Sequence, residues 1–242
     1  ITLDGSGDNS SGKIYISTMG KFKKIAETSR DASLGKIYSR VTKLLGMKPW
    51  EHEYKVMGLA PYANEKYYQK LKKEVFEKLI YLDRKKLCFK QKKRLSMNYC
   101  YDYLVKNLSG ERFDNISGAL QNFTEEIIVN LISEAVKKTK INTVTLGGGV
   151  FMNVKANNLV SKIKKIKKLF IMPSSGDESL SLGAALHCYY EKTKDRNFNK
   201  SILKNLYLGK KNSKLDEDYA VKKLIVNNNK YSIFKKNINQ IA

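Results

Sequence analysis

The sequence predicts an α/β fold with a mixed sheet, in which an antiparallel meander is followed by parallel β–α units. Residues 1–28 contain three short apolar runs separated by turn residues, which is typical of an antiparallel meander. Residues 117–186 repeat the order helix, strand, glycine-containing loop and helix, which indicates strands that lie parallel in one sheet. A length of 242 residues with 42% hydrophobic residues allows one large domain with a sizeable core.

The three strands expected at the start of the chain are ITLDGSG, KIYIST and KIAETS. The first strand ends in D-G-S-G, and Gly5 in this motif is a candidate contact for a bound anion. A strand followed by D-G-x-G leaves backbone N–H groups pointing one way, and such a concavity binds anions. An ordinary hairpin turn is the alternative interpretation of this segment.

A helix is expected to begin after Ser33 and to end before Gly46. The following segment, KPWEHEYKVMGLAPYANE, contains aromatic and aliphatic side chains that are too bulky for a connection lying in solvent. We interpret it as a loop that contacts substrate, with Lys55 meeting an anionic group. A helix start with a buried aromatic anchor is the alternative.

The stretches between this loop and the centre of the chain give weaker signals. Residues 64–81 have the periodicity of an amphipathic helix, and the basic residues 84–94 are expected to form a solvated hairpin or inserted loop. Residues 99–112 show no clear pattern. A long helix is expected over residues 117–138, because apolar residues line one face and lysines occupy its last turn.

The stretch TVTLGGGVFMN, residues 143–153, is the centre of the predicted site. Gly147, Gly148 and Gly149 follow a β-branched run, and glycine accepts positive φ and leaves no Cβ in the way of a ligand. Such a turn can bring backbone N–H groups against a phosphate or the edge of a nucleotide. Asn153 is expected about one helical turn later, where its amide could reach a ribose or a base.

A second glycine-containing loop follows a lysine-faced helix expected over residues 156–168. The apolar run at 169–172 ends at a proline, and the next loop carries Gly176 and Asp177 before another helix. Open α/β sheets bind ligands beyond the carboxyl ends of their strands, so the two loops are expected to form one cradle. A helix N-cap is the alternative role of Asp177.

The net charge of +23 comes mostly from lysines that are spread along the chain with many asparagines. This pattern favours a solvated basic surface over a nucleic-acid interface, although an anionic substrate such as ATP would benefit from the field. The three cysteines show no C-x-x-C spacing, and no apolar run approaches the roughly 20 residues that span a bilayer. We therefore expect a reduced, cytoplasmic setting, no membrane partner and no nucleic-acid partner.

Three segments resemble the carbamoyltransferases of the nodulation-factor and antibiotic-tailoring type. They are SLGKIYSRVTKLLGMKPWEHEYKVMGLAPYA, LGGGVFMNVKANNLV and PSSGDESLSLGAAL, and the resemblance extends in colinear order from residue 1 to about residue 209. E-Y-K-V-M-G-L-A-P-Y is specific to that family, whereas L-G-G-G-x-x-x-N is shared with sugar kinases, actin and heat-shock chaperones. The related tRNA threonylcarbamoyl-transfer enzymes have the glycine turn and the G-D motif but lack the longer segment.

The resemblance implies that residues 1–200 are the second half of an actin-like ATPase (ribonuclease H-like) domain. Residues 201–242 would then be a linker and the start of a truncated C-terminal adenylate-forming domain. The implied reaction uses ATP and carbamoyl phosphate to make carbamoyl adenylate, from which the carbamoyl group passes to a hydroxyl of a sugar or another small acceptor. A fragment of this kind is expected to be inactive on its own.

The resemblance also implies roles for individual residues. The nucleotide would lie at the glycine turn with Asn153, and an iron-type divalent metal would be held by Asp177 and by two histidines from outside this chain. Neither His52 nor His187 has the spacing of that pair, and Ala63 and Ser179 stand where the family commonly has glycine. A tRNA threonylcarbamoyl transferase and a nucleotide-binding module without transfer chemistry are the alternatives.

Overall fold

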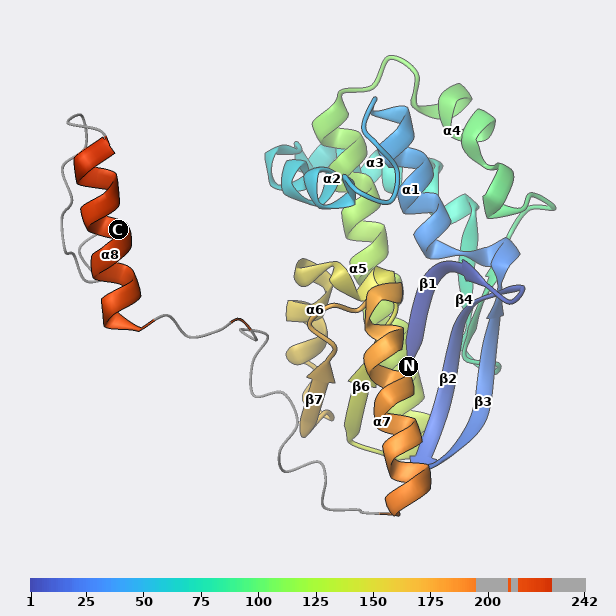
Figure 1. The fold of residues 1–242 in the computed structure, drawn as a ribbon. Coiled ribbons are helices and arrows are strands. Elements are labelled where there is room, and N and C mark those ends of the chain that lie inside the picture. Colours follow the sequence, from blue (N-terminus) through green and yellow to red (C-terminus); the bar gives the residue numbers. More distant parts are fainter. Residues whose placement is uncertain (195–208, 210–212, 228–242) are drawn as a thin grey trace. The chain divides into compact units, whose positions relative to one another are not determined.

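The computed structural model describes residues 1–194, 209 and 213–227, and the chain divides into two compact units (Figure 1). The first unit is Ile1–Lys194, and the second is Asp195–Ala242. Helix α8 (Lys214–Asn227) lies in the second unit, where the sequence predicts a short helix. The strand expected near the end of the chain and most of the expected linker lie outside the described residues.

Strands β1 (Thr2–Gly7), β2 (Ser10–Thr18) and β3 (Lys21–Ser29) form the predicted antiparallel meander. The first turn uses Asp8 and Asn9 at φ of 48° and 62°, which suits the twist of a two-residue hairpin. Asp and Asn tolerate this left-handed region better than most residues, so the local sequence encodes the turn.

Strands β6 (Thr143–Leu146) and β7 (Lys168–Ile171) pair in parallel, as the repeated β–α pattern predicts. β1 continues this pairing, because Leu3 N–H donates to the Gly147 carbonyl and Gly147 N–H donates to the Ile1 carbonyl, each at 3.1 Å. The strands therefore follow one another in the order β3–β2–β1–β6–β7. The prediction of a mixed α/β fold is confirmed.

Helix α5 (Phe113–Thr139) is the central element of the first unit. Its apolar residues are buried on several sides, and Figure 1 shows it running from the group of helices α1–α4 to the sheet. That group comprises α1 (Leu34–Leu44), α2 (Glu53–Leu59), α3 (Glu65–Glu74) and α4 (Tyr101–Leu108), with the hairpin β4 (Ile80–Asp83) and β5 (Cys88–Gln91) beside it. Helices α6 (Val154–Ser161) and α7 (Leu180–Thr193) follow β6 and β7.

Several predicted boundaries are wrong. The helix expected over residues 64–81 ends at Glu74, because a 3₁₀ turn at Phe76–Lys78 leads into β4 and buries Phe76 against Phe123. The helix expected over 156–168 ends at Ser161, although its apolar side chains remain partly buried. Residues 99–112 contain α4, and the basic stretch forms the expected hairpin.

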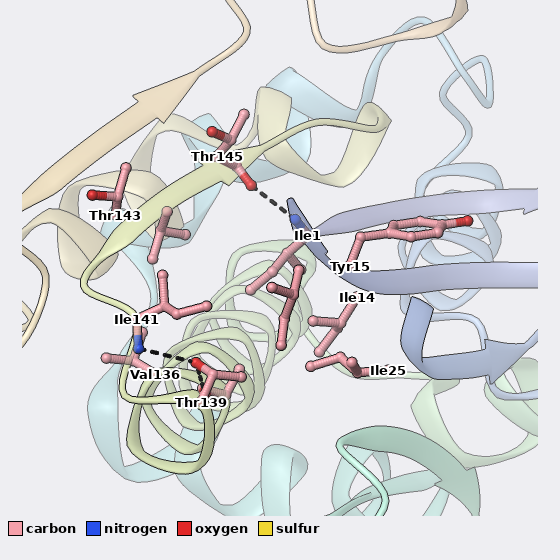
Figure 2. Close-up of a pocket in the computed structure, with 12 residues that line it drawn as sticks. Ile1, Ile14, Tyr15, Ile25, Val136, Thr139, Ile141, Thr143 and Thr145 are labelled. Atoms are coloured by element: carbon pink, nitrogen blue, oxygen red, sulfur yellow. Dashed lines mark hydrogen bonds between the residues drawn. The ribbon is translucent and has the colours of Figure 1, made fainter. Parts of the chain in front are cut away.

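A small cavity of about 60 Å³ lies where β1, β2, β6 and the end of α5 meet (Figure 2). Its walls are mostly aliphatic, including Ile14, Ile25 and Val136. It is too small and too apolar for a nucleotide, so it is a packing gap between the meander and α5.

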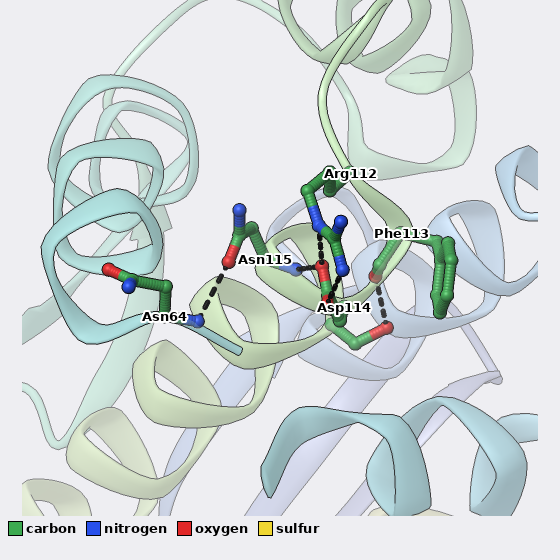
Figure 3. Close-up of polar contacts among 6 residues, drawn as sticks. Asn64, Arg112, Phe113, Asp114 and Asn115 are labelled. Carbon is green, nitrogen blue, oxygen red and sulfur yellow. Dashed lines mark hydrogen bonds and ion pairs between the residues drawn. The ribbon is translucent and has the colours of Figure 1, made fainter. Parts of the chain in front are cut away.

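The start of α5 is fixed by polar contacts to α3 (Figure 3). The Asn115 side-chain oxygen accepts from Asn64 N–H at 2.9 Å, and buried Asp114 accepts from Asn115 N–H and from the Arg112 guanidinium. A Cβ on Gly118 would overlap that of Ala63, so the backbone of α5 lies directly against the turn Ala60–Tyr62. These contacts hold the segment that carries α2 against α5.

Candidate functional site

A pocket of about 600 Å³ opens where the carboxyl ends of β1, β6 and β7 face helices α1, α2 and α5. Its loop side comprises Asp4, Gly5, Gly149, Asn153, Gly176 and Asp177. Its helix side includes Lys36, Ser39, Trp50, Glu53, Tyr54 and Thr124. The structure therefore brings together Gly149, Asn153, Gly176 and Asp177 from the two loops that the sequence predicts to form one cradle, and it adds Gly5, which the sequence gives as a separate anion contact.

The three consecutive glycines have different surroundings. Gly147 and Gly148 do not line the pocket, and their N–H groups donate to the backbone carbonyls of Ile1 and Ser175. Gly148 has φ of +96°, and a Cβ there would overlap the backbone of Leu3. Gly149 alone of the three lines the pocket, and an added Cβ would lie 3.2 Å from Asp4 Oδ1. Gly147 and Gly148 therefore build the turn, and Gly149 presents it to the pocket.

The second loop lies directly against the first. Gly148 N–H donates to the Ser175 carbonyl at 2.8 Å, which joins the two bends that the sequence predicts to be neighbours. Asp177 is exposed and begins a 3₁₀ turn (Asp177–Ser179) without capping it, so the N-cap alternative is wrong. Its carboxylate has no hydrogen bond or ion pair within residues 1–194, which leaves it available to a ligand.

Asn153 begins α6 as its N-cap, where the sequence predicted a position one turn into a helix. Its Oδ1 accepts from Ala156 N–H at 3.0 Å and from Gln121 Nε2 at 2.9 Å, and its Nδ2 donates to Gln121 Oε1 at 2.9 Å. One of the two Nδ2 hydrogens is left for a ligand. These hydrogen bonds to Ala156 and Gln121 hold the Asn153 amide at the pocket wall.

Gln121 does not line the pocket but positions Asn153 there, a role that the sequence does not predict. It is buried on α5, pairs with the Asn153 amide and accepts from the Tyr38 hydroxyl at 2.9 Å. Burial raises the pKa of Tyr38, which keeps that hydroxyl protonated as the donor. The only signal available in the sequence was a glutamine on the apolar face of a long helix.

The lysine beside the pocket is Lys36, and the predicted Lys55 does not line it. Lys55 is exposed, with its Nζ 5.9 Å from the Tyr54 ring centroid. Lys36 lines the pocket because α1 starts against the end of β1, where Ser33 Oγ donates to the Gly5 carbonyl. Gly35 permits this approach, since a Cβ there would lie 2.8 Å from the Asp4 carbonyl oxygen.

A family model described as "Carbamoyltransferase N-terminus" matches residues 1–186. The chain belongs to the carbamoyltransferase family. The predicted family is confirmed, and the match covers both glycine-containing loops and the segment that carries α2.

Several curated proteins are similar to this carbamoyltransferase-family chain. The uncharacterized protein MJ1051 of Methanocaldococcus jannaschii is 30% identical over 86% of this chain. The nodulation protein NolNO of Sinorhizobium fredii is 30% identical and the nodulation protein NolO of Bradyrhizobium diazoefficiens 28% identical, each over 77% of this chain. The chain spans 39%, 27% and 34% of the lengths of these three relatives.

The pocket of this carbamoyltransferase-family chain is acidic, although the whole chain carries a net charge of +23. Its lining includes Asp4, Glu51, Glu53, Asp177 and Glu178, with Lys36 as the opposing charge. Within the described residues no cluster of three or more His, Cys, Asp or Glu side chains could hold a metal ion. None of the described helices is long and apolar enough to cross a membrane.

Proposed function

We propose that the chain is part of an O-carbamoyltransferase, which passes a carbamoyl group from carbamoyl adenylate to a hydroxyl of a small acceptor such as a sugar. The observation that carries this proposal is the junction of the two glycine-containing loops. The Gly148–Ser175 hydrogen bond brings Gly149, Gly176 and Asp177 to one pocket that is large enough for a nucleotide-sized ligand.

The proposed architecture is the second half of an actin-like ATPase domain in residues 1–200. The strand order β3–β2–β1–β6–β7, with an antiparallel meander continuing into parallel strands, supports it. We assign residues 201–242 to a linker and the start of a C-terminal adenylate-forming domain. Because ATP is the expected energy source, the cytoplasm is the expected compartment.

Carbamoyl adenylate would lie along the loop side of the pocket. Gly5, Gly149 and Gly176 leave this side without a Cβ in the way of its phosphate, and Asn153 lines the same space. The Gly5 N–H donates to Asp4 Oδ1 at 2.6 Å, so Gly5 would provide space for the phosphate and not the hydrogen bond that the sequence predicts. Lys36 is better placed than Lys55 to attract an anion, because only Lys36 lines the pocket within residues 1–194.

Asp177 fits the role of one carboxylate ligand to a divalent, iron-type metal, because it is exposed, lines the pocket and has no protein partner among residues 1–194. The other ligands, two histidines in the resemblance, would come from outside the described residues. Such a metal polarises a carbonyl and stabilises charge that develops on oxygen.

In the transfer step the acceptor hydroxyl oxygen bonds to the carbamoyl carbon, the bond from that carbon to the AMP oxygen breaks, and AMP leaves. The acceptor proton must pass to a base, and the pocket carboxylates are the suitable groups. The loop side of the pocket would hold the adenylate in place while the acceptor approaches from the helix side.

The test uses the full-length protein with ATP, carbamoyl phosphate and a panel of hydroxyl acceptors, and a separate reaction supplies threonylcarbamoyl adenylate with tRNA. Asp177→Ala is expected to abolish carbamoyl transfer and to leave the unfolding curve unchanged, because this exposed side chain makes no hydrogen bond or ion pair within residues 1–194. Asp102→Ala, at an exposed position on α4, is the control and is expected to retain activity.

Three other outcomes would contradict the proposal. Loss of folding in Asp177→Ala would make Asp177 a structural residue. Transfer of a threonylcarbamoyl group to tRNA would assign the chain to that reaction, which its basic charge suits. Nucleotide binding without transfer to any acceptor would leave a nucleotide-binding module.

A further inference from the structure

We propose that the helix side of the pocket is the acceptor subsite, where Trp50 and Tyr54 bind the apolar face of a sugar ring. This inference rests on the proposed function, because the ligand is the hydroxyl compound that receives the carbamoyl group. It goes further by naming the surface that selects the acceptor and the chemical class selected, a ring with one apolar face and several hydroxyls.

Trp50 has two features that packing alone does not explain. Its side chain is 72% exposed, although tryptophan is highly buried on average, and its φ is +67°, a region that bulky residues rarely adopt. The Glu53 carboxylate maintains this conformation by accepting from Trp50 N–H at 2.7 Å. Strained backbone that is kept in this way is concentrated at ligand-binding positions.

The aromatic rings at this side form a wall of the pocket. Lys36 Nζ lies over the Trp50 ring, 5.3 Å from its centroid, and Trp50 lines the pocket with most of its surface exposed, so ring surface remains available to a ligand. Tyr54 is 61% exposed and lines the same pocket, as does Met57. A helix does begin in this segment, because α2 starts at Glu53, so the expectation of a loop is wrong there. The buried aromatic anchor of the alternative is also wrong, because Trp50 and Tyr54 are both exposed.

Polar groups next to this wall suit the hydroxyls of a sugar. Ser39 on α1 and Thr124 on α5 line the pocket, and both hydroxyls are buried without a hydrogen-bond partner among the described residues. A buried hydroxyl without a partner is destabilising, and rotation about its Cα–Cβ bond lets it pair with a ligand hydroxyl. Glu53 retains one carboxylate oxygen as a further acceptor.

The acceptor surface adjoins the part of the pocket assigned to the nucleotide at Lys36, which contacts Trp50, but the other groups of the two parts come from different elements. Val150 and Met152 line the pocket beside Gly149 and can contact an adenosine, whereas Trp50 and Tyr54 belong to the segment around α2. Figure 1 shows α2 in the group with α1 and α3, apart from α6 and β7. A cavity of about 600 Å³ that reaches both groups allows adenylate and acceptor to be bound together.

The kinetic test compares Trp50→Leu and Tyr54→Leu with wild type in the full-length protein. Loss of the aromatic face is expected to raise the KM for the acceptor about tenfold, while the KM for ATP and the release of AMP without acceptor stay within about twofold. Tyr62→Leu is the matched control, because Tyr62 lies in the same segment and is 76% exposed but does not line the pocket.

A binding test does not depend on activity. Trp50 is the single tryptophan of the 242-residue chain, so the intrinsic fluorescence of this chain reports its surroundings. We expect a saturable change on titration with at least one of the methyl pyranosides of glucose, galactose, mannose and N-acetylglucosamine. Glycerol, which has hydroxyls but no ring face, is expected to cause none.

The results separate this inference from the proposed function. If wild type transfers carbamoyl groups and the Trp50 and Tyr54 variants change only the KM for ATP, the wall binds the adenine and the inference is wrong while the function stands. Unchanged kinetics in both variants would also overturn it. If wild type transfers to no hydroxyl, the function fails, and the fluorescence titration alone decides whether this side binds a sugar ring.

Discussion

Replacing Gly148 by alanine is expected to destabilise the first unit strongly, whereas the same change at Gly147 is expected to be mild. A Cβ at Gly148 would overlap the Leu3 carbonyl oxygen and lie 2.8 Å from the Leu3 carbonyl carbon, and both atoms belong to the β1 backbone. The φ of +96° at Gly148 adds strain for any residue with a side chain. A Cβ at Gly147 would meet nothing within 4 Å.

The magnitude follows from these two contributions. The unfavourable φ costs about 1–3 kcal/mol. Moving β1 to relieve the overlap costs about 1–3 kcal/mol more, as for other insertions into packed regions. Gly148→Ala should therefore lower the free energy of unfolding by about 2–6 kcal/mol, and Gly147→Ala by less than about 1 kcal/mol.

The assay is urea unfolding of the two variants and wild type, followed by far-UV circular dichroism. Alanine keeps the N–H that joins the two loops, but the backbone shift that relieves the overlap with Leu3 would displace it. Gly148→Ala should therefore weaken ATP binding as well, which equilibrium dialysis can measure. Equal unfolding free energies for the two variants would refute the assignment of separate roles to adjacent glycines.

Three further predictions address the pocket and its support. Lys36→Met is expected to weaken ATP binding about tenfold, because Lys36 lines the pocket. Lys55→Met is expected to change ATP binding by less than about twofold, because Lys55 does not line it. Equal effects of the two variants in equilibrium dialysis would contradict this prediction. Gln121→Leu is expected to lower the free energy of unfolding by about 1–3 kcal/mol and to raise the KM for ATP, because it leaves the Tyr38 hydroxyl and the Asn153 amide without their buried partner. The Arg112 guanidinium holds the pKa of Asp114 below its usual value, so wild type should have a larger free energy of unfolding than Asp114→Asn, by about 1 kcal/mol at most. This difference should be fully present above pH about 4 and should disappear as the pH falls through the lowered pKa. Urea titrations at several pH values test this, and a difference that does not depend on pH would show that the pair contributes nothing.

Most of the elements could be predicted from the sequence because their signals are local. The meander follows from short apolar runs and Asp, Asn and Gly turns, and α1 follows from its periodicity and the Ser33 cap, whose oxygen accepts from Lys36 N–H at 3.0 Å. The long apolar face of α5 and the basic hairpin were recognisable for the same reason. Boundaries such as the end of α3 were not, because packing of Phe76 against Phe123 decides them.

The sequence by itself determined the mixed α/β fold, the carbamoyltransferase family and the fact that two glycine-containing loops follow neighbouring strands. Only the tertiary structure decided which groups face the pocket. In the folded chain the N–H groups of Gly147 and Gly148 are hydrogen-bonded to backbone carbonyls, and Trp50 is exposed. Lys36 lines the pocket, whereas the sequence suggested Lys55. Periodicity, caps and turns depend on residues close in the chain, whereas hydrogen-bond partners and exposure depend on segments that meet only after folding.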